Sequence, residues 1–359
     1  MTADLNTENH VLVEQTGSLG VITLNRPKAL NSLTYEMVQA VDAALTRFEG
    51  EPSVAAVLVC GAGERGLCAG GDIRQVLESV KAGKTAQAAA FWRDEYRMNA
   101  RISHFPKPYI AIMDGITMGG GVGISAHGSH RIVTERLRLA MPETGIGFFP
   151  DVGATWLLTR KPGEFGLFMG LTGEIIGADD AIRVGLADAF VPSEKIAALR
   201  EALSAVPPGG GAGAVSAAIA RFVQTPPPSP VSDADRAMID RVFAHETVEG
   251  ILAALEQEEG AFAARILGVL NSRSPTALKI ALRMLRLARG SPSLEECLNR
   301  EFAGSAQILT LGDFHEGVRA AVIDKDRNPR WQPASLAEVT EGTIAPFFKP
   351  HQEPPFGRP

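Results

Sequence analysis

Apolar runs near the start of the chain predict two strands, a helix and a third strand. Val11–Gln15 and Val21–Asn25 are rich in β-branched residues and flank the turn Gly17–Gly20, which is the pattern of a β-hairpin. Thr34 is a suitable N-cap for the helix that follows, where apolar residues recur at helical spacing. Val54–Cys60 is apolar almost throughout, as expected for a strand buried on both faces. The order strand, helix, strand indicates an α/β fold.

A later strand and helix meet at three consecutive glycines. Lys107–Met113 is a short apolar run typical of a buried strand, and Val122–Ala126 is small and apolar enough to begin a buried helix. Gly119–Gly121 lies between them, and each glycine costs roughly 0.5–1 kcal/mol relative to alanine. Two interpretations remain open. Either the turn is tight for packing reasons, or bare N–H groups at the helix start face an anion or a polarised carbonyl.

Helical spacing predominates in the second half of the chain. Val206–Gly213 is rich in glycine and proline, and Thr225–Pro230 is rich in proline, so a boundary is expected there. Charged and proline-containing sequence after Trp331 predicts a poorly ordered end. We therefore expect a core over residues 1–205, a Gly/Pro-rich linker over 206–232, an all-α region over 233–335 and a tail over 336–359.

Composition narrows the class of protein. The chain has 359 residues, 45% hydrophobic and 21% charged, which is a globular balance with enough apolar residues for a large core. A net charge of −6 argues against nucleic acid as a partner. Three cysteines without metal-ligand spacing indicate reduced thiols. The first residues resemble neither a signal nor a transit peptide, and no apolar run is long enough to span a membrane, so a soluble, cytoplasmic protein is expected.

Two carboxylates, Glu143 and Asp151, stand in the stretch Met141–Gly153, which is otherwise apolar and rich in glycine and proline. Such surroundings desolvate a carboxylate, raise its pKa and make it a better general base. Asp151 has a structural alternative, because it could be the N-cap of a helix that begins at Ala154. Glu143 has no comparable alternative.

Two further features are weaker signals of function. The loop Gly61–Gly71 ends in a Gly-Gly pair that offers a second set of bare amides, and Asp72 is placed to cap the next helix. An ordinary strand-to-helix loop explains this pattern equally well. Glu95 falls within a helix predicted over 86–104, where a glutamate is usually solvated.

Several common chemistries are excluded by motif. Gly119–Gly123 does not fit a dinucleotide fingerprint, and the chain has no phosphate-binding Gly-Lys-Ser/Thr turn and no His-Glu-x-x-His zinc helix. Gly128-Ser129-His130 lacks the glycine that would complete a nucleophile elbow. Two glycine-amide turns and a carboxylate remain, a set suited to a substrate carbonyl that becomes an oxyanion.

Four separated motifs resemble the crotonase (enoyl-CoA hydratase/isomerase) superfamily. They are Asn25–Leu33, Ala69–Ile73, Gly119–Gly121 and Pro142-Glu143, and the similarity extends over about residues 10–335. The resemblance implies a crotonase-like spiral of ββα units with an all-α C-terminal region. It also implies a small-molecule acyl-CoA substrate and, because members often form trimers, a homo-oligomer.

One departure distinguishes branches of this superfamily. Hydratases carry a glutamate two residues after the triple glycine and another twenty positions further on, whereas this chain has Gly123 and Glu143 there. Asp151 occupies a position that is glycine in the hydratases. Together with the late run Asp313–Ala320, this combination resembles the thioester-hydrolase branch.

The resemblance assigns residues to an expected site. The thioester carbonyl oxygen would accept hydrogen bonds from the N–H groups of Gly71 and Gly120, and Glu95, Glu143 and Asp151 match the substrate-contacting acids. Coenzyme A is part of the substrate, so no separate cofactor and no metal are expected. The coenzyme A path would be lined by Lys28, Ala29, Leu30, Ala69, Gly71, Asp72 and Ile73.

The implied reaction is hydrolysis of 3-hydroxyisobutyryl-CoA in valine catabolism, with 3-hydroxypropionyl-CoA as a smaller candidate substrate. Glu143 would act either as a nucleophile that forms an acyl-enzyme anhydride or as a general base on water. Asp151 and Glu95 would hold the acyl 3-hydroxyl and the attacking water. The alternatives are a hydratase or isomerase of the same fold and a non-catalytic acyl-CoA-binding member.

Overall fold

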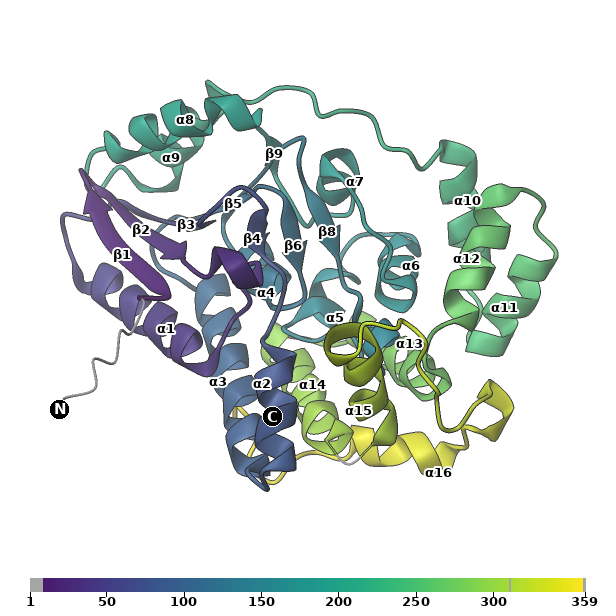
Figure 1. Ribbon diagram of the computed structural model, residues 1–359. Helices are drawn as coiled ribbons and strands as arrows, with labels where there is room; N and C mark the ends of the chain where they lie inside the picture. The colour runs from purple at the N-terminus through teal and green to yellow at the C-terminus, as the bar shows by residue number, and fades with distance from the viewer. Residues whose placement is uncertain (1–8, 310, 358–359) are drawn as a thin grey trace.

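Two β-sheets form the scaffold of the computed structural model, which describes residues 9–309 and 311–357 (Figure 1). The strands are β1 (Val11–Thr16), β2 (Leu19–Leu24), β3 (Ala56–Gly61), β4 (Gly66–Cys68), β5 (Tyr109–Met113), β6 (Ile116–Met118), β7 (His130–Val133), β8 (Arg138–Ala140) and β9 (Ala189–Phe190). The larger sheet has the order β1-β2-β3-β5-β7-β9, and the smaller has the order β4-β6-β8. β1 and β2 form the predicted antiparallel hairpin, and the pairings that follow along both sheets are parallel.

The chain repeats one pattern as it winds through the two sheets. β3, β5 and β7 are neighbours in the larger sheet, and each is followed by a strand of the smaller sheet. α2 (Ile73–Lys81) and α3 (Thr85–Ser103) follow β4, and α4 (Gly120–Ala126) follows β6. This repetition confirms the expected spiral of ββα units.

Successive strand residues point to opposite sides of a sheet, and the central strands β3 and β5 of the larger sheet are buried on both sides. Val57 and Val59 of β3 lie in the main hydrophobic core, whereas Leu58 between them lies in a second core. α8 (Ile196–Ser204) and α9 (Gly211–Ala220) cover this second core (Figure 1). The continuous apolar sequence of β3 thus has its explanation in burial from two sides.

The segment 206–232, expected to be a linker, contains the packed helix α9. Val215 and Ile219 of this helix are buried against the sheet. Apolar residues at helical spacing there outweigh the helix-disfavouring glycines that suggested a flexible break. After α9 the chain takes an extended path to the C-terminal helices (Figure 1).

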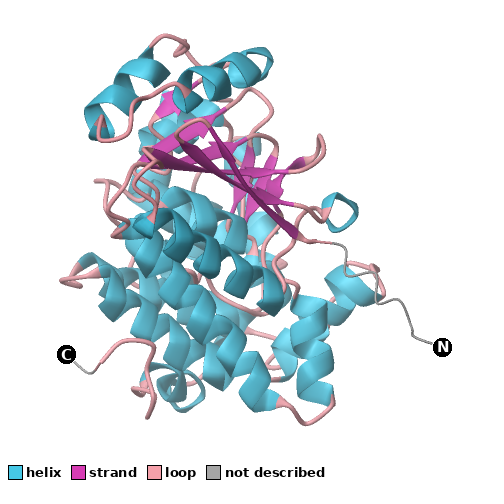
Figure 2. Cartoon of the chain, turned by 90° about the vertical axis from the view of Figure 1, so that its left-hand side faces the viewer, coloured by secondary structure: helices cyan, strands magenta, loops and turns pink. Residues whose placement is uncertain are grey.

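Helices dominate the rest of the described chain, and Figure 2 shows the sheet between a small and a much larger layer of helices. A π-helix over Arg319–Ile323 continues the helix before it. Among the described residues, no helix combines the length and the apolar composition needed to span a bilayer. The remaining α-helices are α1 (Tyr35–Gly50), α5 (Ala154–Leu157), α6 (Phe165–Thr172), α7 (Ala178–Arg183), α10 (Asp233–Val242), α11 (Val248–Glu256), α12 (Ala261–Asn271), α13 (Pro275–Arg289), α14 (Leu294–Ile308), α15 (Gly312–Val318) and α16 (Glu341–Ile344).

The end of the chain is ordered as far as residue 357, so the expectation of a poorly ordered tail is wrong. α16 and the 3₁₀ turn after it pack on α13 and α14. Val339, Ile344 and Phe347 are buried there, at 4%, 8% and 1% exposure. A few apolar residues anchor a segment whose overall composition is polar.

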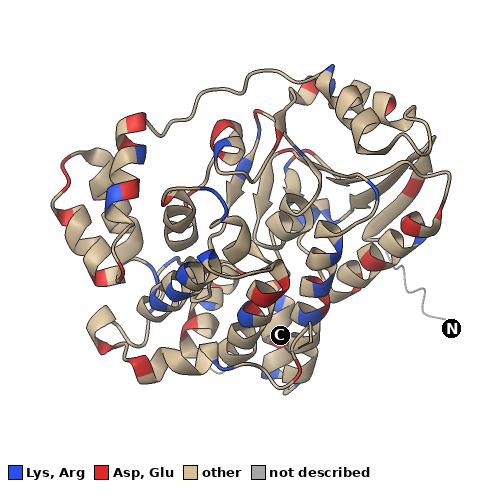
Figure 3. Ribbon diagram, turned by 180° about the vertical axis from the view of Figure 1, so that it is seen from behind, with Lys and Arg blue, Asp and Glu red and all other residues tan. Residues whose placement is uncertain are grey.

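Basic residues of α13 are paired with acidic residues of other elements. Lys279 Nζ lies 2.6 Å from a Glu249 carboxylate oxygen, and an Arg283 nitrogen lies 2.6 Å from a Glu341 carboxylate oxygen. Figure 3 shows acidic and basic residues interspersed over the helices. These pairs tie α13 to α11 and α16.

Candidate active site

A cavity of about 730 Å³ lies where the loops after β4 and β6 meet α3 and the loop after β8. Its wall also includes Phe314 of α15 and Ala320 of the π-helix. Residues of the C-terminal region therefore complete the wall of a cavity that is otherwise lined by the ββα spiral. Eight of the residues expected from the sequence line it: Leu30, Ala69, Gly71, Ile73, Glu95, Gly120, Glu143 and Asp151.

The two glycine turns face each other across this cavity. A Cβ atom added at Gly120 would lie 3.3 Å from the Gly71 nitrogen, so the two backbone segments are close neighbours. Gly120 is the first residue of α4, and Gly71 is held by a β-bridge to Leu33. Neither the Gly71 nor the Gly120 N–H donates a hydrogen bond to any residue that the structure describes. Two backbone donors without an acceptor in the described chain thus lie side by side in the cavity wall, where an oxyanion site would need them.

Glycine is required in the second turn because carboxylates crowd it. A Cβ at Gly119 would lie 2.9 Å from Glu143 Oε1, and one at Gly120 would lie 2.7 Å from Glu95 Oε1. Gly119 also has φ +49°, in the left-handed region that side chains disfavour. Packing accounts for the third glycine, because a Cβ at Gly121 would lie 2.3 Å from the Cys68 carbonyl oxygen, whereas Gly119 and Gly120 border the carboxylates of the cavity.

Glu143 begins a 3₁₀ turn over Glu143–Ile146 and is 7% exposed. Its Oε2 atom is buried and has no hydrogen-bond partner within residues 9–309 and 311–357. Burial, reinforced by the nearby charge of Asp151, raises the pKa of this carboxyl well above its ordinary value. Glu143 therefore has the environment that the sequence predicted.

Asp151 does not cap a helix, so the structural alternative is wrong. Gly153 precedes α5 without a side-chain cap, and Asp151 Oδ2 accepts a hydrogen bond of 2.7 Å from the Tyr96 hydroxyl. Burial raises the pKa of Asp151 to about 7, although the Tyr96 hydrogen bond opposes this shift.

The residue after Asp151 has a strained backbone. Val152 has φ +55°, a conformation that costs a β-branched residue on the order of 1–3 kcal/mol. Its carbonyl lies 2.8 Å from His127 Nε2, and the next amide, of Gly153, donates to Glu301 Oε2 at 2.7 Å. These contacts hold the strained loop that carries the Asp151 carboxyl.

Glu95 is buried on α3 at 2% exposure, so the expectation of a solvated helix residue is wrong. Its Oε1 atom is enclosed and makes no hydrogen bond to the described chain. Burial and then the charge of Asp151 raise its pKa well above the ordinary value. Glu95, Glu143 and Asp151 thus form a cluster of acids whose charged forms disfavour one another.

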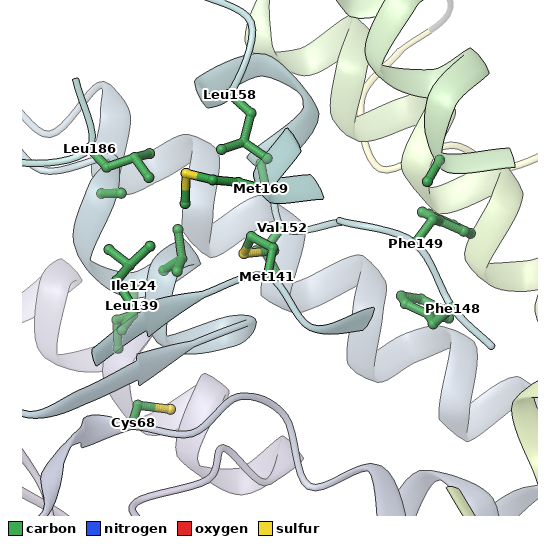
Figure 4. Packing of buried hydrophobic residues seen from close by; sticks show 14 of the residues in the cluster. Cys68, Ile124, Leu139, Met141, Phe148, Phe149, Val152, Leu158, Met169 and Leu186 are labelled. Carbon is green, nitrogen blue, oxygen red and sulfur yellow. The ribbon is translucent and has the colours of Figure 1, made fainter. Parts of the chain in front are cut away.

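The position where hydratases carry their first glutamate is filled. A Cβ at Gly123 would lie 2.8 Å from Val152 Cβ and 2.9 Å from Asn99 Nδ2. Figure 4 shows Val152 beside Met141 at the centre of packed apolar side chains. A longer side chain at residue 123 therefore has no space.

Three residues expected on the coenzyme A path lie away from this cavity. Asp72 caps α2 through Gln75 N and pairs with Arg26 at 3.1 Å, which confirms the capping interpretation. Lys28 and Ala29 line a separate open hollow of about 580 Å³.

Sequence reasoning missed the residues that support the acids. Tyr96 follows Glu95 directly on α3, but its contact with Asp151 spans 55 residues of sequence. The cavity wall also contains aromatic rings in contact: Trp92 stacks on Phe148 with 5.6 Å between the ring centroids, and Phe314 packs at a tilt against Phe148, also at 5.6 Å. The aromatic pair Phe148-Phe149, which follows Glu143 closely in the sequence, could have predicted an aromatic wall near this acid.

Two solved structures are similar to this chain over nearly its whole length. One, described as a carnitinyl-CoA dehydratase from Mycobacterium thermoresistibile, has a TM-score of 0.90 and 46% identity, covering 97% of this chain and 98% of that one. Another, described as an enoyl-CoA hydratase from Rhodobacter sphaeroides 2.4.1, has a TM-score of 0.86 and 41% identity, covering 95% and 97%.

Curated relatives carry a different name. The "3-hydroxyisobutyryl-CoA hydrolase, mitochondrial" of Rattus norvegicus is 43% identical over 342 residues, covering 94% of this chain and 88% of the relative. The protein of the same name from Homo sapiens is 42% identical over 357 residues, covering 97% and 91%. These names contradict the expected cytoplasmic location, because both relatives are mitochondrial.

The family assignment rests on fold, site and sequence together. The spiral of ββα units and the two facing glycine amides are the features that the four sequence motifs led us to expect. A family model described as enoyl-CoA hydratase/isomerase matches residues 19–348. The chain belongs to the enoyl-CoA hydratase/isomerase family.

Proposed function

We propose that this protein hydrolyses the thioester of 3-hydroxyisobutyryl-CoA, releasing 3-hydroxyisobutyrate and free coenzyme A in valine catabolism. The observation that carries the proposal is the placement of two free amides, of Gly71 and Gly120, beside the buried Glu143. The curated relatives that share 42–43% identity with the chain support the same reaction through their names.

The amides bind the atom on which charge develops. The thioester carbonyl oxygen accepts hydrogen bonds from the N–H groups of Gly71 and Gly120 and becomes an oxyanion when the carbonyl carbon is attacked. Each such donor typically contributes ~2.7–4 kcal/mol to the transition state. No metal is needed for this step, because backbone dipoles supply the positive potential.

Glu143 activates the attack in one of two ways. As a nucleophile, its carboxylate displaces the coenzyme A thiolate and forms an anhydride, which water then cleaves to the acid and free Glu143. As a general base, it takes a proton from water, which attacks the thioester directly. A single turnover in water labelled with heavy oxygen separates the routes, because label retained in the Glu143 carboxyl indicates the anhydride.

The two other acids orient the reactants. Glu95 Oε1 and Glu143 Oε2 are buried without partners in the described chain, so they are available to polar groups of a ligand. We assign Glu95 and Asp151 to the acyl 3-hydroxyl and the attacking water. Coenzyme A enters as part of the substrate, along the wall that includes Leu30, Ala69 and Ile73.

A hydratase activity is the main alternative, and the names of the two solved structures favour it. The lack of space at Gly123 argues against it, because Val152 and Asn99 occupy the place of the first glutamate of the hydratases. A non-catalytic member would bind the thioester and leave it intact.

We also propose that the protein forms a homo-oligomer.

Thiol release tests the proposed function. The purified protein is incubated with 3-hydroxyisobutyryl-CoA, 3-hydroxypropionyl-CoA and crotonyl-CoA, and free thiol and hydration are measured in parallel. Rapid thiol release from the first substrate is expected. Hydration of crotonyl-CoA without thiol release would favour the hydratase, and binding without either reaction would favour the non-catalytic alternative.

A further inference from the structure

A chain of hydroxyl groups leads from Asp151 into the core. Tyr96 Oη lies 2.7 Å from Asp151 Oδ2 and 2.8 Å from Ser305 Oγ, and Ser305 Oγ lies 3.0 Å from the Glu301 carbonyl oxygen. Asp151 is 6% exposed, and Tyr96, Ser305 and Glu301 are fully buried. The mechanism proposed above does not use Tyr96 or Ser305.

The hydrogens available to this chain depend on Asp151. Three contacts connect four oxygen atoms, but the Tyr96 and Ser305 hydroxyls supply one hydrogen each and the carbonyl supplies none. When Asp151 is ionised, both hydrogens point toward it, so that Ser305 donates to Tyr96 and Tyr96 donates to the carboxylate. When Asp151 is protonated, these two hydrogen bonds reverse, and Ser305 donates a third hydrogen bond, to the Glu301 carbonyl.

We propose that Tyr96 and Ser305 are positioning residues whose hydroxyls reorient to provide a hydrogen-bond partner for Asp151 in both its ionised and its protonated form. Each hydroxyl keeps its own hydrogen, so no proton passes along the chain. The proposal rests on the hydrolase function only in assigning Asp151 to the reactants. It explains how a buried carboxyl can change its protonation state without leaving an unpaired polar group.

Other titratable groups lie near Asp151, and the charge of Asp151 raises the pKa of the acids among them. Glu95 on α3, Glu143 on the loop after β8 and Glu301 on α14 are buried acids near it. His127, at the end of α4, contacts the Val152 carbonyl next to it. Burial disfavours a charge on Asp151, and the hydrogen bonds from the Tyr96 hydroxyl and from the backbone favour the ionised form and lower its pKa.

The two positioning residues have opposite expected effects on the pKa of Asp151. Tyr96→Phe removes the donor to the carboxylate, and hydrogen bonds to charged groups are the stronger ones, so the pKa rises by about one unit. Ser305→Ala leaves that donor in place. It removes one hydrogen bond from the arrangement around ionised Asp151 and two from the arrangement around protonated Asp151, so the pKa falls.

Infrared titration of the substrate-free protein tests this directly. The carboxylic-acid band of Asp151 is identified by its loss in Asp151→Asn and is followed against pH in each variant, beside the pH profile of kcat/KM for thiol release. Tyr109→Phe is the matched control, because Tyr109 is also fully buried and donates instead to the Ile124 carbonyl at 2.9 Å. Thermal unfolding verifies that each variant is folded.

Opposite shifts in Tyr96→Phe and Ser305→Ala, with no shift in Tyr109→Phe, support the proposal. Shifts in the same direction, or titrations identical to the unmodified protein, overturn it. The infrared readout needs no substrate, so a protein that lacked hydrolase activity would still give an answer. Failure of the proposed function is therefore distinguishable from failure of the proposed reorientation of the Tyr96 and Ser305 hydroxyls.

Discussion

At the residue scale, the chemistry of the cavity depends on buried acids, some of whose oxygen atoms have no hydrogen-bond partner in the described chain. Glu95, Glu143 and Asp151 share one enclosed volume, and two of them retain an unpartnered oxygen within the described chain. A substrate that brings hydroxyl, water and carbonyl groups into this volume provides the missing partners. In the free protein these carboxylate oxygens are therefore available to hydrogen-bond with a ligand.

Glu143→Gln should reduce kcat for thiol release by about 10²–10⁴-fold, because glutamine keeps the shape of the side chain but is neither nucleophile nor base. The measurement is a thiol-release assay with 3-hydroxyisobutyryl-CoA. Glu201→Gln is the control, since Glu201 is an exposed residue of α8. An unchanged rate in Glu143→Gln would remove Glu143 from the mechanism.

Gly120→Ala should reduce kcat/KM by about 10²–10³-fold. The added methyl group would lie 2.7 Å from Glu95 Oε1 and 3.2 Å from Leu33 Cδ1, which displaces the amide at the oxyanion site. Gly213→Ala in α9 meets no atom within 4 Å and should leave activity intact. Equal activities of the two variants would contradict the role of the Gly120 amide.

Residue chemistry predicted part of the site. The apolar setting of Glu143 and Asp151 was visible in their neighbours along the chain, and both acids are buried as expected. The contact between Tyr96 and Ser305 spans 209 residues of sequence, and no local pattern specifies which hydroxyl meets which. Family resemblance assigned Glu95 to the substrate-contacting acids, whereas a glutamate within a helix was otherwise expected to be solvated.

At the element scale, caps and helix junctions connect the C-terminal wall to the spiral. Ser274 caps α13 by accepting from Ala277 N at 3.0 Å, and its hydroxyl also donates to Asp313 Oδ2 of α15 at 2.6 Å. α15 carries Phe314, which lines the cavity. One buried serine thus fixes two helices at the edge of the site.

Ser274→Ala should lower the free energy of unfolding by about 1–2 kcal/mol and raise KM, because α15 loses its hydrogen bond to α13. Urea unfolding and steady-state kinetics measure the two effects. Ser232→Ala removes the exposed cap of α10, and it should cost stability without changing KM. A KM equally altered in both variants would separate α15 from substrate binding.

Strands and helices were easier to predict where burial makes a whole stretch of sequence apolar. β3, β5 and α4 follow directly from apolar runs and glycines. The tail was harder, because three buried apolar residues do not stand out in a polar stretch and their partners lie on α13 and α14. Tertiary contacts decide the structure of such segments, and composition alone does not report them.

At the scale of the whole molecule, the buried acids make folding stability depend on pH. Asp151 has a pKa of about 7 in the folded protein, raised from the ordinary value of 3.8. The folded state therefore binds a proton that the unfolded state has lost over this interval. The contribution of Asp151 is complete below about pH 4 and is lost as pH rises through about 7.

Asp151→Asn should make this dependence shallower by a few kcal/mol between these limits, because the amide has no proton to lose. Denaturant unfolding measured at several pH values between them gives the slope. Asp233→Asn, at an exposed position of α10, should keep the dependence of the unmodified protein. A slope unaffected by Asp151→Asn would show that other groups account for it.

The order in which the site is assembled during synthesis follows from the distant origin of its wall. The amides of Gly71 and Gly120 and the acids of the cavity belong to the first half of the chain, whereas Ser305, Phe314 and Ala320 come near its end. A ribosome therefore exposes the reactive half of the cavity long before the residues that enclose it are translated. The complete cavity therefore exists only after the C-terminal helices have been translated.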